Sequence, residues 1–161
     1  MAESPEDLIR AVYIANAITV SRKSDSALLR AVRPLLGESW WERMAITIGN
    51  TVYLPDHVEN PWAHVNLLKH EAIHVAQYRR WGWLFWIAYL FLPLPVGLAY
   101  FRYRWEREAY VEAEIMAAAP HNRDRLAQWV ANILSQSTYA WAWPRPLILR
   151  SIRKIIKERG G

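Results

Sequence analysis

The chain has 161 residues, a length that suits one compact domain. It contains no cysteine, which excludes disulfides, thiol nucleophiles and thiolate metal sites, so a metal would have to bind His and carboxylate side chains. The net charge is +5, and the excess lies in residues 144–161, because residues 1–143 carry 14 Lys and Arg against 14 Asp and Glu. Ten tryptophans suit either a core with polar partners or a belt at a membrane surface.

The first residues predict a helix over about 5–19. Ser4 is a good N-cap, and Pro5 suits the first helical position. A second helix is expected from about Asp25 to the residue before Pro34, because proline disfavours the helical conformation of its predecessor. The N-terminal residues lack the cationic and apolar regions of a secretory signal, which predicts a cytoplasmic protein.

The one convincing strand signal is a hairpin at 45–54. Two β-branched runs flank Gly49 and Asn50, a pair typical of a type I′ or II′ turn. The edge of this hairpin would suit a peptide held as an added strand, or the hairpin would simply cover the core.

Helical patterns follow the hairpin at 62–80, at 102 to about 119 and at 122 to about 137. Residues 144–159 predict a basic amphipathic helix. We therefore expect a mostly α (α+β) fold with a short β-hairpin, in which residues 1–143 form a single domain and residues 144–161 a C-terminal helix.

The predicted helix at 62–80 carries the pattern H-E-x-x-H, from His70 through Glu71 to His74. Positions four apart on a helix lie on one face, so both imidazoles can bind one Zn²⁺, and Glu71 is placed as the general base that takes a proton from water. Two histidines can also share a helix face by chance, although the full pattern arises by accident in under about 1% of chains this long.

A second acidic motif, Glu106-Arg107-Glu108-Ala109-Tyr110, follows His74 by 32 residues. It resembles the E-x-x-A-D element that supplies the third zinc ligand in gluzincin metallopeptidases. The two motifs together, with Gln77, resemble small uncharacterised bacterial proteins with an HExxHxxQ…ExEA layout, over residues 44–114. The resemblance implies a zincin-like fold, Glu106 as third ligand and hydrolysis of peptide bonds in a peptide or protein substrate.

Several roles around this site stay open. Glu108 is the rival third ligand, because residues two apart on a helix face nearly opposite ways. Tyr110 replaces the Asp that usually steadies a zinc-binding histidine, so Glu108 or another nearby Glu would take that part. Gln77 would orient substrate or a ligand, or be solvated. Tyr110, Tyr139 and His121 are candidates to stabilise an oxyanion, with packing as the alternative role.

Residues 81–101 carry no charge and are long enough to cross a bilayer, but Pro93, Pro95 and Gly97 interrupt them. A single span would also separate the two histidines from Glu106, so we expect none. The segment is either core or in contact with a membrane, and the number of its aromatic residues favours peripheral contact on the inner face.

The basic helix at 144–159 would suit an anionic lipid surface, or would dock on the domain as an ordinary amphipathic helix. Its apolar face argues against nucleic acid. Three rivals to a membrane-associated zinc peptidase remain: a non-catalytic membrane-binding protein with a structural or degenerate metal site, a nucleic-acid-associated zinc protease, and a zinc hydrolase of non-peptide amides.

Overall fold

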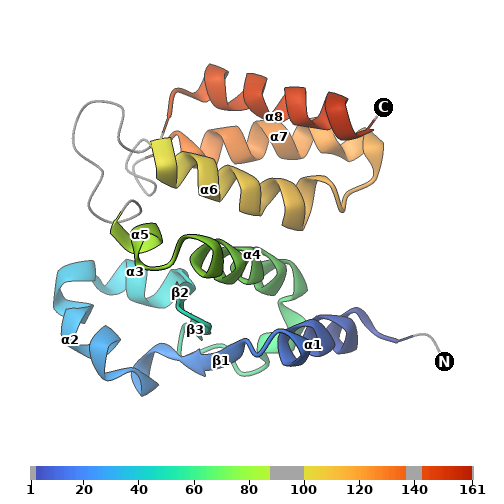
Figure 1. The fold of residues 1–161 in the computed structure, drawn as a ribbon. Coiled ribbons are helices and arrows are strands. Elements are labelled where there is room, and N and C mark those ends of the chain that lie inside the picture. The colour runs from blue at the N-terminus through green and yellow to red at the C-terminus, as the bar shows by residue number, and fades with distance from the viewer. Residues whose placement is uncertain (1–2, 88–99, 137–142, 161) are drawn as a thin grey trace. The chain divides into compact units, whose positions relative to one another are not determined.

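The computed structural model describes residues 3–87, 100–136 and 143–160, and these are mostly helical with one small sheet (Figure 1). Contacts divide the chain into two compact units, Met1–Val75 and Ala76–Gly161, with the boundary inside one continuous helix, α4. The predicted α+β class is confirmed. The helices are α1 Pro5–Ala15, α2 Ala27–Leu36, α3 Glu38–Arg43, α4 Val65–Trp81, α5 Trp83–Trp86, α6 Tyr100–Tyr110, α7 Pro120–Leu134 and α8 Arg145–Gly160. The strands are β1 Thr19–Arg22, β2 Ile46–Ile48 and β3 Thr51–Leu54.

Helix α1 begins as expected, with Ser4 as N-cap accepting from the Asp7 N–H at 3.1 Å. Its expected end at residue 19 is wrong. The helix stops at Ala15, and Ala17 adopts a left-handed φ of 47°, after which the chain continues as β1. Strand β1 was not expected, because the hairpin was the only strand signal recognised. Its backbone pairs in parallel with β3, more than thirty residues away, from Thr19 with Thr51 onward.

The expected stop of the second helix before Pro34 is also wrong, because α2 continues to Leu36. Proline lacks an N–H, so the hydrogen bond to the carbonyl of Arg30 is missing. Pro34 stands in the last turns of α2, so few further backbone hydrogen bonds of the helix follow it. The Gly37 N–H donates to the Arg33 carbonyl, and Gly37 itself ends the helix at φ 77°.

The predicted hairpin is confirmed. β2 and β3 are antiparallel, with Ile48 paired to Thr51 across the two-residue loop. Gly49 has a φ of 62° and Asn50 does not have a positive φ, which is the pattern of a type II′ turn. The strand order is β1-β3-β2, so β2 is an edge strand among the described residues.

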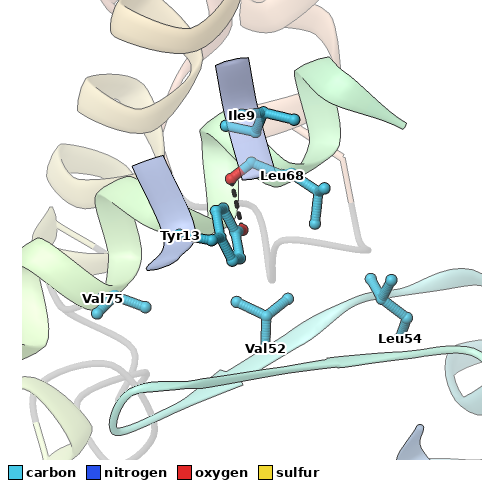
Figure 2. Close-up of a cluster of buried hydrophobic side chains, with 6 residues drawn as sticks. All are labelled: Ile9, Tyr13, Val52, Leu54, Leu68 and Val75. Atoms are coloured by element: carbon cyan, nitrogen blue, oxygen red, sulfur yellow. Dashed lines mark hydrogen bonds between the residues drawn. The ribbon is translucent and has the colours of Figure 1, made fainter. Parts of the chain in front are cut away.

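The core of the first unit joins α1, β3 and α4 (Figure 2). Its fully buried members are Ile9, Tyr13, Val52, Leu54, Leu68 and Val75. The Tyr13 hydroxyl donates to the backbone carbonyl of Leu68 at 2.7 Å, which ties α1 to α4 through the core. Alternate residues of β3 point to this cluster, as expected of a strand with one buried face.

In the second unit α7 packs against both α6 and α8. Ile148 and Ile152 of α8 are fully buried, and Arg153 of α8 pairs with Asp124 of α7 at 2.7 Å. The basic C-terminal helix therefore docks part of its apolar face within its own unit. None of the helices in the described ranges is long and apolar enough to cross a membrane.

Lys23, directly after β1, is a buried cation. Its Nζ donates to the carbonyls of Trp40 and Trp41 at 3.2 and 2.5 Å and lies 5.1 and 5.6 Å from their ring centroids. Burial lowers the pKa of Lys23 to about 8, while the negative charges of Asp56 and Glu71 act in the opposite sense.

Lys23 predicts a pH-dependent stability. The pKa is about 8 when folded, against 10.5 for an ordinary lysine. Between these values the unfolded chain binds more protons, so the free energy of unfolding should rise with pH by roughly 1–3 kcal/mol relative to Lys23→Met. Urea denaturation across this pH range measures the difference. Lys154→Met, at an exposed position, should show no such trend, and a flat difference for Lys23→Met would contradict the lowered pKa.

Candidate metal centre

Helix α4 buries two adjacent rows of side chains. Leu68, Glu71 and Val75 form the row that faces the sheet, since Leu68 and Val75 belong to the core of the first unit. The spacing of three and four residues keeps this row on one face. His70, His74 and Gln77 form the neighbouring row with the complementary spacing of four and three, and all three are buried. The predicted helix over 62–80 is confirmed, apart from a start three residues later.

The two histidines lie side by side, as their spacing predicts. Their Nε2 atoms are 3.1 Å apart, and their rings meet edge to face with centroids 4.8 Å apart. Each side chain is about nine-tenths or more buried, with exposed fractions of 7% and 6%. Two imidazole nitrogens at this separation can share either one proton or one metal ion.

Glu71 is buried beside them and is held by the sheet. Thr47 Oγ1 donates to Glu71 Oε2 at 2.6 Å. Thr47 reaches this carboxylate because it pairs directly with Val52, and paired residues of antiparallel strands point to the same face, which here is the face that α4 covers. The hydroxyl thus fixes one carboxylate oxygen of Glu71.

Two further groups of the first unit feel the charge of Glu71. Burial, followed by that charge, raises the pKa of the Tyr13 hydroxyl well above its usual range, so Tyr13 stays neutral. The negative charge of Glu71 also attracts the Lys23 ammonium, which raises the pKa of Lys23 and partly opposes the effect of burial. One neutral hydroxyl and one buried amine of the first unit therefore lie within electrostatic range of Glu71.

Gln77 has a structural role in the second unit. Its Nε2 donates to the Trp105 carbonyl and to Glu108 Oε2, both at 3.1 Å. Gln77 is 5% exposed, so it is not the solvated residue considered above. These bonds fasten the C-terminal half of α4 to α6.

The two candidate third ligands differ in burial. Glu106 is 2% exposed, whereas Glu108 is exposed and accepts the bond from Gln77. Residues two apart on α6 do face different ways, as expected. His70, His74 and Glu106 are each buried and each offers a ligand atom suited to a metal ion.

The other predicted residues are placed as follows. Tyr110 is largely buried and meets the Trp129 ring edge to face at 5.8 Å, a packing contact. His121 is exposed at the start of α7. Tyr139 lies outside the described residues. His57 and His64 are exposed and line a cavity of about 390 Å³ in the first unit.

Sequence reasoning missed Thr47, Tyr13 and Lys23. For Thr47 a signal existed: a two-residue Gly-Asn loop pairs residue 47 with residue 52, which places Thr47 on the face of the apolar Val52. For Tyr13 and Lys23 no local signal existed, because their partners lie 17 to 55 residues away.

Comparisons of the chain with protein-family models, with curated proteins and with solved structures found no match. The gluzincin resemblance therefore stays a prediction.

Proposed function

We propose that this protein is a zinc-dependent hydrolase of peptide bonds, with His70, His74 and Glu106 as metal ligands and Glu71 as general base. The main support for this proposal is the 3.1 Å separation of two buried histidine Nε2 atoms beside a buried carboxylate. Tetrahedral zinc with Zn–N bonds of 2.0–2.1 Å would hold two nitrogens roughly 3.3 Å apart. The histidine pair is thus close to the spacing that zinc requires.

The assignment of Glu106 as third ligand is supported by α4 itself. Gln77 follows His74 by one turn on the same row, and its amide bonds the carbonyl of Trp105, the residue before Glu106. The burial of Glu106 favours it over Glu108, since a zinc ligand set leaves little ligand surface exposed. Two His and one Glu also form a common ligand set for catalytic zinc, which leaves a position for water.

The proposed chemistry assigns separate tasks to the side chains. Bound zinc would lower the pKa of a coordinated water toward about 7 and polarise the substrate carbonyl. Glu71 would take a proton from the attacking water and pass it to the leaving amine nitrogen. Thr47 donates to Oε2 of Glu71, so Oε1 would make this transfer.

A peptide substrate is supported by the position of β2. This strand lies at an edge of the sheet and carries Thr47, which contacts Glu71. The free side of an edge strand can bind an extended peptide through main-chain hydrogen bonds, independent of its side chains. A peptide bound there would lie close to the general base.

The metal assignment predicts about one zinc ion per purified chain. His70→Ala, His74→Ala and Glu106→Ala should each lower zinc affinity at least tenfold, measured by elemental analysis and competition with a chromophoric chelator. Glu108→Ala is the matched control on α6 and should keep its zinc. An unchanged zinc content in His70→Ala would contradict the proposal. If Glu108→Ala lost zinc while Glu106→Ala kept it, Glu108 would be the third ligand.

The role of Glu71 predicts that Glu71→Gln keeps zinc and fold but loses hydrolysis by roughly 10²- to 10⁴-fold, because the amide cannot accept the proton. A fluorescence-quenched peptide library is the substrate. Glu59→Gln, at an exposed position in the same unit, should match the wild type. Equal turnover by Glu71→Gln would contradict the mechanism, and a fully loaded wild type without turnover would favour a structural metal site.

Thr47 is proposed as a positioning residue for Glu71. Thr47→Val should lower kcat roughly tenfold with little change in KM, because a hydrogen bond to a charged group is lost while side-chain shape is kept. Thr47→Ser, which restores the hydroxyl, should recover most of kcat. A change in KM alone, or failure of serine to rescue, would assign Thr47 a purely structural role.

A further inference from the structure

In the second unit, the end of α4, helix α5 and the start of α6 expose apolar side chains around one buried indole. Trp105 is 4% exposed and contacts the rings of Phe85, Phe101 and Trp81, with centroids 4.7, 5.7 and 6.4 Å away. Trp81 and Phe101 are themselves 43% and 38% exposed. Because both rest on the same indole, they belong to one continuous surface.

Helix α5 extends this surface. Phe85 is buried against Trp105 and so anchors α5, while its neighbours Trp83, Leu84 and Ile87 are 68%, 50% and 40% exposed. Gly82, at a left-handed φ of 59°, forms the turn between α4 and α5. We call these five exposed residues, Trp81, Trp83, Leu84, Ile87 and Phe101, the Trp105 surface. Monomeric proteins seldom expose so many large apolar side chains together.

The stretch of chain that forms this surface carries charges of one sign. Residues 72–105 contain four arginines, Arg79, Arg80, Arg102 and Arg104, and no Asp, Glu or Lys. Arg79, Arg80 and Arg104 are exposed, and the guanidinium of Arg80 lies 5.8 Å from the centroid of the Trp81 ring. The apolar surface is therefore flanked by cations on both helices that border it.

We propose that the Trp105 surface docks on the interface of a lipid bilayer with anionic headgroups. Tryptophan suits this region because its ring is apolar and its N–H is polar, and arginine can pair with headgroup phosphates while its stem lies on apolar surface. The aliphatic Leu84 and Ile87 fit acyl chains, whereas a surface for single-stranded nucleic acid would rely on stacking aromatic rings. This proposal does not depend on the metal site.

Helix α8, the other basic amphipathic segment, is less suited to this role. Ile148 and Ile152 are buried within the second unit. Arg153 is paired with Asp124 and Arg159 with Glu112, so part of the cationic charge is already compensated. The lipid contact expected from the sequence is thus better assigned to the Trp105 surface than to residues 144–159.

Flotation of the full chain with vesicles tests the proposal. Phosphatidylcholine vesicles with about one third phosphatidylglycerol should bind the protein, with a blue shift of tryptophan emission, and should bind it more weakly as salt is raised. The double variant Trp83→Asp, Leu84→Asp should bind at least roughly tenfold more weakly while keeping the wild-type circular dichroism. Leu35→Asp is the matched control, because Leu35 is 85% exposed on α2 and lies outside the Trp105 surface.

A second variant tests the cationic flank without touching the apolar residues. Arg80→Gln with Arg104→Gln should lower affinity for anionic vesicles by roughly 20-fold at low salt and leave binding to pure phosphatidylcholine unchanged. Vesicle binding that neither variant weakens, or that Leu35→Asp weakens equally, would overturn the proposal. So would absence of vesicle binding together with binding of single-stranded DNA that both variants abolish.

Discussion

Helix α4 carries two buried rows of side chains, and the candidate site depends on both rows. The row with Leu68, Glu71 and Val75 completes the core of the first unit, and the adjacent row carries His70, His74 and Gln77. A single helix can serve both because the two rows differ by one residue in register, about 100° around the axis. The Tyr13 hydroxyl holds the Leu68 carbonyl at the point where both rows begin.

The first unit is small, and burial of polar groups in it is costly unless each finds a partner. Glu71 receives the Thr47 hydroxyl, and Lys23 receives two backbone carbonyls and two indole faces. The Thr47 hydroxyl comes from the hairpin, and the two carbonyls and two indoles come from the short helix α3. The sheet and α3 therefore supply polar partners for the buried charges as well as packing.

The excess of tryptophan has more than one explanation. Trp41 is buried beside Lys23, and its indole N–H donates to Asp56 at 3.3 Å, so it serves a core with polar partners. Trp105 organises an aromatic cluster in the second unit, whereas Trp81 and Trp83 remain exposed at its edge. The composition left two roles open for tryptophan, and different tryptophans take them. Trp41 and Trp105 belong to the core, and Trp81 and Trp83 are proposed to contact a membrane.

Local signals determined much of this protein from sequence alone. Three features involve only residues within four positions of one another: the Ser4 cap, the Gly49-Asn50 turn and the spacing of His70 and His74. All the groups that interact in each feature are therefore present in a short stretch of sequence. The side-by-side placement of the two imidazoles needed nothing beyond a helix.

Tertiary structure alone decided the features whose partners are distant. Strand β1 forms because the backbone of β3, more than thirty residues away, pairs with it. Thr47 bonds Glu71 because the sheet packs against α4. Lys23 is buried because the chain folds it against Trp40 and Trp41 of α3. Burial and strand pairing depend on residues brought together only by folding, so no window of sequence could contain them.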